Sequence, residues 1–466
     1  MNDREGGQDG RMHDDAAHLP GVADDGAVPQ EGAAPSARAA RVSRRGLLGT
    51  LGGGAVGAVL GGAAVALGRG SAAAFEPAAS SAAPATAIVE FMGEHQAGIV
   101  TPAQDRMHVA AFDVTTTSLD DLVSLMKDWS SAIGFLSRGL PVGGSAGAGG
   151  DDLLSPPEDT GEAVGLTAGN LTVTVGFGRS LFVDAEGKDR FGLKSKLPEA
   201  LIDLPHFPGD QLEEARSGGD IVVQACADDP QVAVHAIRNL SRIGFGRASV
   251  RWSQIGFGRT ASTSKAQATP RNLFGFKDGT ANVKAEDASV VDEHVWISGL
   301  EGESAWANGG SFMVTRRIRM TIETWDRQNL GEQQLVVGRA KASGAPLSGG
   351  EEFTEPDFAK KGADGPLIDV NSHVALSHPS RHSGAQMLRR GYNYTDGTDG
   401  LGRLDAGLFF IAFVVDPRTH YVPIQNLISK QDLMQEYVRH TGSGLFIVPP
   451  GINMAGSYLG KSLLEG

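Results

Sequence analysis

The sequence predicts an α+β protein built from two ferredoxin-like halves. Between residues 107 and 257, stretches typical of strands are interleaved with stretches typical of helices. The same interleaving returns after residue 310 and continues to residue 448. Strands mixed with helices that pack on one face are typical of α+β architecture, and the repetition indicates an internal structural duplication. We expect an N-terminal half over residues 86–270 and a C-terminal half over residues 271–466.

The elements of the first half follow from apolar periodicity and from the residues that start its helices. Ser118 and Asp121 resemble a capping box and precede apolar residues at helical spacing. Asp229 followed by Pro230 is typical of a helix start, and this helix is expected to run to Ile243. Strands are predicted at residues 107–114, 171–175, 221–226 and 248–257.

The second half repeats the pattern with shorter helical signals. Residues 312–322 alternate as a half-buried strand does, and residues 330–337 are helical. Residues 408–415 form a continuous apolar run that is typical of a buried strand. A helix over residues 431–440 and a last strand over residues 445–448 complete this half.

Length, composition and charge exclude several classes of protein. The 466 residues are enough for a large core, and the 64 glycines predict many tight turns and long loops. The single cysteine, Cys226, excludes a disulfide framework, a four-cysteine zinc site and a cysteine-held iron–sulfur cluster. The formal net charge of −14 argues against binding to nucleic acid, because phosphate backbones attract basic proteins.

The N-terminal region resembles an export signal. Residues 1–42 have no apolar periodicity and are predicted to be a disordered lead-in. Arg44 and Arg45 then precede a weakly apolar run, which ends in small residues at 71–74 that suit a signal peptidase. A transmembrane anchor is the alternative, but the glycines within the run weaken it. Twin arginines favour Tat export, so we expect a signal peptide over residues 1–74 and the Tat translocation machinery as a partner. The product would be extracellular, periplasmic or associated with the cell envelope.

Three copies of Gly-Phe-Gly-Arg stand at residues 176–179, 244–247 and 256–259. A phosphate-binding loop would need a third glycine in G-x-G-x-x-G, which each copy lacks. Tight turns or bulges at strand ends explain the three copies better.

Polar residues that could carry chemistry are concentrated in two segments, 272–282 and 371–394. The second contains His373, His378 and His382. These three histidines could be solvated loop residues, ligands of a zinc or copper ion, or a single haem ligand with two bystanders. Pro379 weakens the metal-site interpretation, because it prevents the regular helix that would bring the rings together. Spacing alone does not choose among the three.

Four blocks of sequence, taken together and in order, resemble the dye-decolorising peroxidases, most closely the Tat-exported branch that includes the deferrochelatase/peroxidases. The blocks are GFKDGT at 275–280, HVALSHP at 373–379, LRRGYNY at 388–394 and HTGSGLF at 440–446. The resemblance spans roughly residues 86–455. It implies a fold of the dimeric α+β barrel type, with one haem b per chain between two ferredoxin-like halves and most haem ligands in the C-terminal half.

The resemblance assigns roles to individual residues. His373 corresponds to the proximal iron ligand, Asp278 to the distal acid–base residue and Arg389 to the distal arginine, which also contacts the haem. The remaining positions that line the haem in the family are Gly279, Thr280, Ala281, His378, Pro379 and Ser380.

This chain departs from the family pattern at two positions. Many members carry Asn-Pro-Arg after the ligand, whereas this chain has His378, Pro379 and Ser380, with Arg381 one place later. An arginine contact to a haem propionate therefore has no residue at its usual position. Some relatives also carry an asparagine two places after the distal arginine, where this chain has Gly391.

The implied activity is that of a haem b peroxidase, which reduces hydrogen peroxide and oxidises an organic reductant such as a dye, a phenol or a porphyrin through a ferryl intermediate. Asp278 would move a proton between the peroxide oxygens, and Arg389 would stabilise the charge that develops on the leaving oxygen. Because an aspartate carries out this step, we expect activity skewed to acidic pH. Asp432 is our candidate acceptor for the second N–H of His373, since such ligands usually donate to a partner.

The sequence leaves two alternative functions open, and it also leaves open the oligomeric state and the residues that could relay electrons. The first alternative is a haem-handling deferrochelatase that releases iron from haem, and the second is a non-haem metal-binding protein. A homo-oligomer is also left open. Six aromatic residues could relay electrons to a buried cofactor, although each is more readily explained as a core residue. They are Tyr392, Tyr394, Trp252, Trp296, Trp306 and Trp325.

Overall fold

A computed structural model describes residues 88–466 except 145–146, 150–152 and 364. The described residues form one compact unit. The predicted lead-in and signal peptide lie outside the described residues, so their assignment stays a prediction, as does the division of the chain at residue 270. Within the described part, no helix is both long and apolar enough to cross a membrane.

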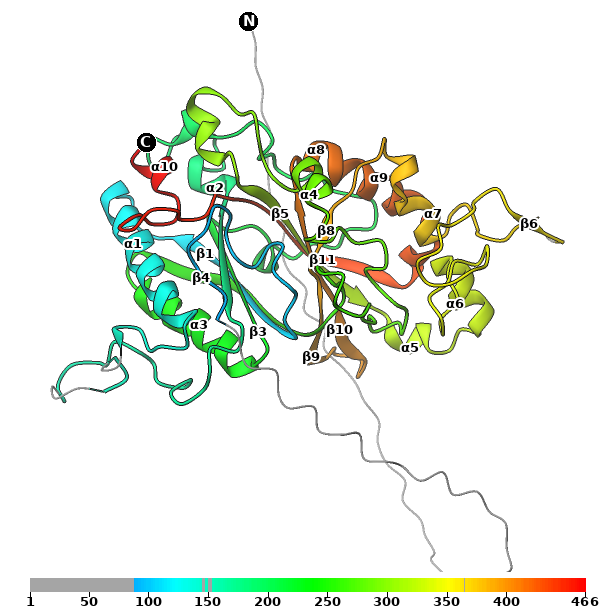
Figure 1. Ribbon diagram of the computed structural model, residues 1–466, viewed down its shortest axis with the longest axis horizontal. Coiled ribbons are helices and arrows are strands. Elements are labelled where there is room, and N and C mark those ends of the chain that lie inside the picture. The colour runs from blue at the N-terminus through cyan, green and yellow to red at the C-terminus, as the bar shows by residue number, and fades with distance from the viewer. Residues whose placement is uncertain (1–87, 145–146, 150–152, 364) are drawn as a thin grey trace, which may run out of the picture. The chain divides into compact units, whose positions relative to one another are not determined.

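The centre of the fold is an antiparallel sheet that closes on itself (Figure 1). Eight strands follow one another in the order β5-β11-β2-β3-β1-β4-β9-β10, and β10 pairs in turn with β5. A short ninth strand, β8, pairs with β10. Such closure removes the exposed edges that an open sheet would present. The strands are β1 (Arg106–Val114), β2 (Thr172–Gly178), β3 (Ile221–Ala227), β4 (Ala248–Arg259), β5 (Ser311–Met320), β8 (Leu388–Arg389), β9 (Tyr392–Thr398), β10 (Leu404–Val414) and β11 (Val438–Val448), with a separate pair β6 (Lys361–Gly362) and β7 (Gly365–Pro366).

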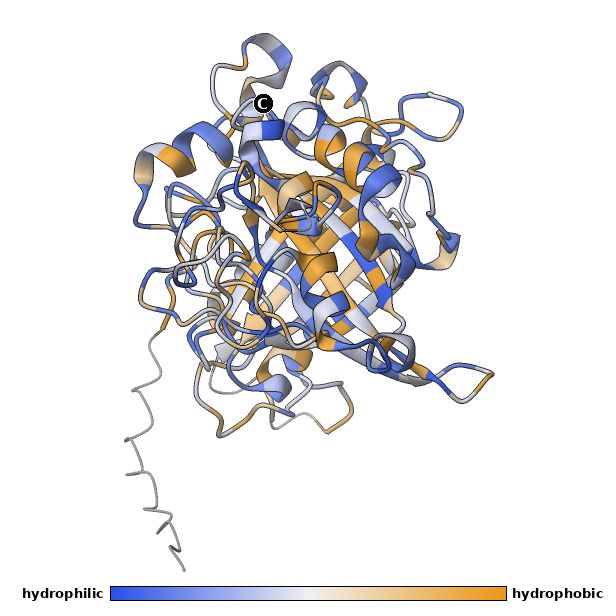
Figure 2. Cartoon of the chain, turned by 90° about the vertical axis from the view of Figure 1, so that its right-hand side faces the viewer, coloured by the Kyte–Doolittle hydropathy of each residue, from blue (hydrophilic) through white to orange (hydrophobic). Residues whose placement is uncertain are grey.

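Alternate residues of each strand enter two separate cores. Along β1, Met107, Val109 and Ala111 belong to the core that also contains Phe409 of β10. Phe112, on the opposite face, packs in the core that includes residues of the two long helices. Apolar stretches on the strands are visible at the centre of Figure 2. The period-two alternation read from the sequence is therefore the alternation between these two cores.

The two long helices begin where their capping residues predict. Helix α1 (Leu119–Leu136) has Ser118 as its N-cap, with the side chain accepting from the backbone N–H of Asp121. Helix α3 (Pro230–Ile243) has Asp229 as its N-cap and proline in its first turn. The other helices are α2 (Arg179–Phe182), α4 (Ala288–His294), α5 (Ile322–Trp325), α6 (Leu330–Val337), α7 (His373–Ser377), α8 (Pro417–His420), α9 (Val422–Gln431) and α10 (Lys461–Leu464), and short 3-10 turns include η4 (Gly302–Ala307), η5 (Pro379–Arg381) and η6 (Leu433–Glu436).

One predicted helix is wrong. Residues 431–440 contain the end of α9, the short turn η6 and the first residues of β11. Asp432 stops α9, because its side chain accepts from the backbone N–H of Met434 and starts the new turn. The last strand consequently begins at Val438, earlier than predicted.

The three Gly-Phe-Gly-Arg copies lie at turns and irregularities, as expected. The first ends β2, the second connects α3 to β4, and the third lies at the end of β4. In the third copy the pairing of β4 with β9 shifts register between Phe257 and Arg259. Gly258 between them has φ +52°, a backbone conformation that glycine adopts readily.

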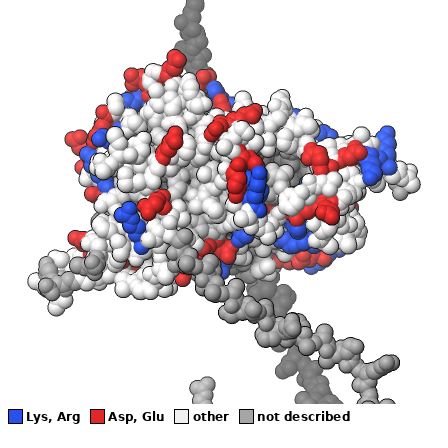
Figure 3. Space-filling view, in the orientation of Figure 1, with Lys and Arg blue, Asp and Glu red and all other residues white. Residues whose placement is uncertain are grey.

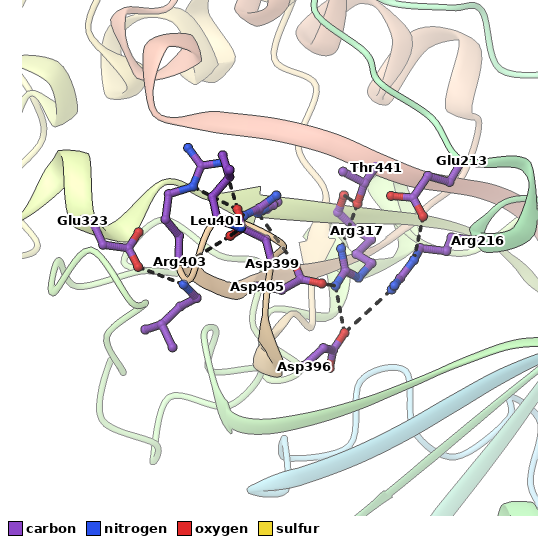
Figure 4. Close-up of polar contacts among 12 residues, drawn as sticks. Glu213, Arg216, Arg317, Glu323, Asp396, Asp399, Leu401, Arg403, Asp405 and Thr441 are labelled. Carbon is purple, nitrogen blue, oxygen red and sulfur yellow. Dashed lines mark hydrogen bonds and ion pairs between the residues drawn. The ribbon is translucent and has the colours of Figure 1, made fainter. Parts of the chain in front are cut away.

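A buried arginine connects four strands of the barrel (Figure 4). Arg317 of β5 is 3% exposed and donates to Asp396 of β9 at 2.8 Å and to Asp405 of β10 at 2.9 Å. It also donates to Thr441 of β11 at 2.9 Å and to Gln254 of β4 at 3.0 Å. Four acceptors on four strands satisfy the guanidinium, so this buried charge is fully paired.

Candidate active site

A cavity of about 380 Å³ lies against the outer side of β5, β10 and β11. Its described lining residues all fall between Asn272 and His440, within the predicted C-terminal half. Its apolar wall includes Ile318 of β5, Leu408 of β10 and Ile424 of α9. That a cofactor lies between the two halves stays a prediction, because residues of the first half do not contribute to this described lining.

The structure brings His373, Asp278 and Arg389 together at this cavity, from three separate segments. His373 is the first residue of α7, whose N-cap Ser372 accepts from the backbone N–H of Ala375. Arg389 lies on β8, opposite Ala412 of β10. The sequence placed these three residues up to 111 positions apart. The fold places all three in the wall of one cavity.

Asp432 is the hydrogen-bond partner of His373, as the sequence analysis expects. Oδ2 of Asp432 lies 2.6 Å from Nδ1 of His373, and the carboxylate is fully buried. Burial alone would lower the pKa of His373, but the charge of Asp432 and this hydrogen bond more than offset that effect and raise it. The imidazole is thereby oriented with Nε2 available for a ligand bond.

Asp278 and Arg389 form an ion pair that two asparagines hold in place. Nη1 of Arg389 donates to Oδ1 of Asp278 at 2.7 Å, and Nδ2 of Asn272 donates to Oδ2 at 3.2 Å. Asn282 accepts from the backbone N–H of Arg389 at 2.7 Å and donates to its carbonyl at 2.9 Å. Asn272 therefore fixes the Asp278 carboxylate, and Asn282 fixes the backbone of Arg389. Sequence reasoning gave neither asparagine a role, although both lie in the polar segment 272–282.

Gly279 follows Asp278 at a close approach of two backbone segments. Its φ is +84°, and a Cβ there would lie 2.8 Å from Cα of Ala261. Glycine is required on both grounds, the positive φ and the contact. Gly279, Thr280 and Ala281 all line the cavity, and their contact with a haem stays a prediction.

The residues after His373 are only partly in the cavity. His378 and Pro379 line it, but Ser380 does not. The hydroxyl of Ser380 lies 2.8 Å from Nδ1 of His378, so it orients that ring instead. Any contact of Ser380 with a cofactor stays a prediction.

The structure does not support a tri-histidine metal site. The described part of the chain contains no group of three or more His, Cys, Asp or Glu residues that could hold a metal ion. His373 pairs with Asp432, His378 with Glu355, and Nε2 of His382 with the carbonyl of Leu376. Helix α7 ends at Ser377 and Pro379 opens a separate short turn, so no regular helix runs through the three histidines.

The candidate relay aromatics are core residues. Tyr392, Tyr394 and Trp325 are fully buried, and Trp252, Trp296 and Trp306 retain no more than 8% exposure. Burial raises the pKa of Tyr394 well above its usual value, so its hydroxyl stays protonated at neutral pH.

The donor set of the cavity fits a haem. The His373 imidazole is oriented by a carboxylate, the Asp278 carboxylate and the Arg389 guanidinium share the cavity, and the rest of the wall is largely apolar. These features define a haem-dependent peroxidase.

Comparisons with known proteins agree with this class and give the family. Models described as Dyp-type peroxidase, N-terminal and Dyp-type peroxidase, C-terminal match residues 96–258 and 269–453. The chain belongs to the Dyp-type peroxidase family, whose members bind haem and use hydrogen peroxide.

The similar proteins cover most of the chain. A deferrochelatase of Yersinia pseudotuberculosis serotype I (strain IP32953) is 40% identical over 379 residues, which cover 80% of this chain and 84% of that protein. A deferrochelatase of Escherichia coli O6:K15:H31 is 38% identical over 80% of this chain and 87% of that protein. Ferric DtpA from Streptomyces lividans matches with a TM-score of 0.73 and 38% identity, over 83% of this chain and all of that one. A DyP-type peroxidase from Streptomyces coelicolor matches with a TM-score of 0.74, 39% identity and the same coverage.

Proposed function

We propose that this peroxidase reduces hydrogen peroxide at a haem b held in the described cavity, with His373 as the proximal ligand. One observation carries the proposal. The His373–Asp432 pair and the Asp278–Arg389 pair line the same cavity. When bound, the haem supplies the redox chemistry, and an organic reductant returns the electrons.

The residues of the chain move the proton and stabilise charge. The Asp278 carboxylate accepts the proton of one peroxide oxygen and returns it to the other, so that water leaves. Arg389 stabilises negative charge on the leaving oxygen through its positively charged guanidinium. Both Asp278 oxygens already accept from donors, so the carboxylate is oriented before peroxide arrives.

The absorption spectrum of the full chain reconstituted with haemin tests the assignment of His373. We expect a Soret band that shifts in His373→Ala, because the axial ligand is removed. A Soret band identical in the two proteins would overturn it. His382→Ala is the matched control, since His382 bonds a backbone carbonyl and does not line the cavity.

Release of iron from haem is a second candidate function, favoured by the curated relatives named deferrochelatase. Product analysis separates it from peroxidase turnover. Oxidised dye or porphyrin indicates peroxidase chemistry, whereas intact metal-free porphyrin indicates iron extraction. The proposed reductants are dyes, phenols or porphyrins.

We also propose Tat export, two ferredoxin-like halves and a location outside the cytoplasm. Arg44, Arg45 and the small residues at 71–74 support export. Replacing both arginines with lysine should abolish processing of the precursor on an immunoblot, and unchanged processing would contradict the Tat route.

On the face shown in Figure 3, basic and acidic side chains are interspersed, which fits a protein that does not bind nucleic acid. Sedimentation would determine the oligomeric state, which stays open.

A further inference from the structure

Four lysine or arginine residues line the cavity, and three of them have carboxylate partners. Lys277 pairs with Glu352, Arg316 with Asp210, and Arg389 with Asp278. The fourth is Arg339, which forms no ion pair with any described residue.

Arg339 is buried yet incompletely bonded. It is 7% exposed and follows Gly338, the C-cap of α6. Nη1 donates to the carbonyls of Gly344 and Glu352, each at 2.8 Å. Nε and Nη2 donate to no residue in the described part of the chain, although a guanidinium has five N–H groups. A buried cation without a counter-ion is costly, and burial accordingly lowers the pKa of Arg339, against the opposing charges of Glu352 and Glu355.

The acidic side chains near Arg339 are committed to other partners. Glu352 accepts from Lys277 and, at 3.3 Å, from the hydroxyl of Thr280. Burial alone would raise the pKa of Glu352, but these donors more than offset it, so the carboxylate stays ionised. Glu355 lies 2.8 Å from Nε2 of His378 and is largely exposed. Among the described lysine and arginine residues that line the cavity, Arg339 is therefore the one without an ion-pair partner.

We propose that Arg339 binds a propionate of the haem. A carboxylate from the bound group would supply the missing counter-ion and accept from the free N–H groups of the guanidinium. This assignment rests on the proposed haem site. It also supplies an arginine for the propionate, which this chain lacks at the Ser380 position where many family members carry one. The neighbouring Arg381 is exposed and does not line the cavity. Arg339 reaches the cavity from a different segment, 34 residues before His373.

Two forms of the cofactor isolate the contact. Haem-free full-length protein is titrated with haemin and with haemin dimethyl ester, in which both propionates are esterified and uncharged. We expect the wild type to prefer haemin. Arg339→Met should weaken haemin binding about 10-fold to 100-fold and change ester binding less than about 2-fold, since hydrogen bonds to charged groups contribute in this range. Arg381→Met is the matched control, and both of its affinities should stay at the wild-type values.

The outcomes separate the proposal from its alternatives. An equal loss for haemin and ester in Arg339→Met would show that Arg339 only holds the Gly344 and Glu352 carbonyls, and would overturn the proposal. If Arg339→Met does not fold, Arg339→Gln keeps two N–H donors for those carbonyls and should show the same loss of preference. A wild type that binds both forms equally would refute the propionate contact and leave the haem site standing. A wild type that binds neither would refute the haem site itself.

Discussion

Nη1 of Arg389 lies 2.7 Å from Oδ1 of Asp278, so the two residues form an ion pair. Their side chains are partly buried, at 27% and 15% exposure. A carboxylate that accepts from a guanidinium is oriented, but its charge is partly balanced by the group that we propose stabilises the leaving oxygen. The two residues should therefore act as one unit.

Asp278→Asn, Arg389→Leu and the double variant test this coupling. Loss of the proton carrier should slow peroxide reduction about 10²-fold to 10⁴-fold, and loss of the guanidinium about 10²-fold to 10³-fold. The double variant should be little slower than Asp278→Asn, because residues that act together are not additive. Stopped-flow measurement of peroxide reduction checks this, with Arg381→Leu as the exposed control. Fully multiplicative losses would mean that the two act independently.

Asn272 is expected to support catalysis through Asp278. Nδ2 of Asn272 lies 3.2 Å from Oδ2 of Asp278, while its Oδ1 accepts from the backbone N–H of Phe274 at 3.0 Å. Asn272→Asp retains the turn acceptor but places a second carboxylate beside Asp278. We expect it to slow peroxide reduction more than Asn272→Ala, about 10-fold or more against several-fold, with haemin affinity unchanged in both. The reverse order of the two variants would mean that Asn272 serves only the turn.

Asp432 should control how firmly His373 holds the iron. The two oxygens of Asp432 serve separately, one as the cap on the Met434 N–H and the other as the partner of His373 Nδ1. Asp432→Asn has a single oxygen, so it keeps only one of these two roles and also removes the charge. Asp432→Ala removes both roles. We expect haemin affinity to fall about 10-fold to 100-fold in Asp432→Ala and less in Asp432→Asn. The reduction potential of the bound haem should rise in Asp432→Asn, because the imidazole donates less electron density. A potential equal to that of the wild type in a spectroelectrochemical titration would contradict this role.

Local signals predicted the long elements of the fold well. Ser118 and Asp229 fix the starts of α1 and α3 through bonds to neighbouring backbone N–H groups, so three or four residues of sequence are sufficient. The short helices α5, α7 and α8 carry too few residues for a periodicity. Closure of the barrel by β5 and β10 depends on pairing between distant strands, which local pattern does not report.

The site likewise contains residues that the sequence alone could predict and one residue that only the folded structure reveals. The resemblance to the family predicted roles for His373, Asp278 and Arg389, and the structure places all three at one cavity. Asp432 was predicted because ligand histidines usually bond an acceptor through their second nitrogen, and it does contact His373. Arg339 could not be found in this way. Its significance comes from burial and from the lack of a carboxylate partner, and both are tertiary properties of the chain.

His108 should make the protein less stable in acid. It lies on β1 between Ala225 of β3 and Ile255 of β4, and its Nδ1 is buried without a hydrogen-bond partner. Burial lowers the pKa of His108 from 6.5 to about 4.

At pH values between about 4 and 6.5, His108 binds a proton in the unfolded chain but not in the folded chain. The free energy of unfolding therefore falls as pH drops from about 6.5 to about 4, by about 3 kcal/mol at most, and this contribution is constant below that range. His440, with a pKa lowered by burial to about 3, adds a decrease of the same sign.

His108→Leu removes one of these titrations. We expect the fall in the Tm of the haem-free protein between pH 7 and about pH 4.5 to be smaller in this variant than in the wild type. His206→Leu, at an exposed loop position, should retain the wild-type dependence on pH. If His108→Leu and the wild type lose the same number of degrees, the acid sensitivity arises elsewhere, and the buried Nδ1 of His108 is not one of its sources.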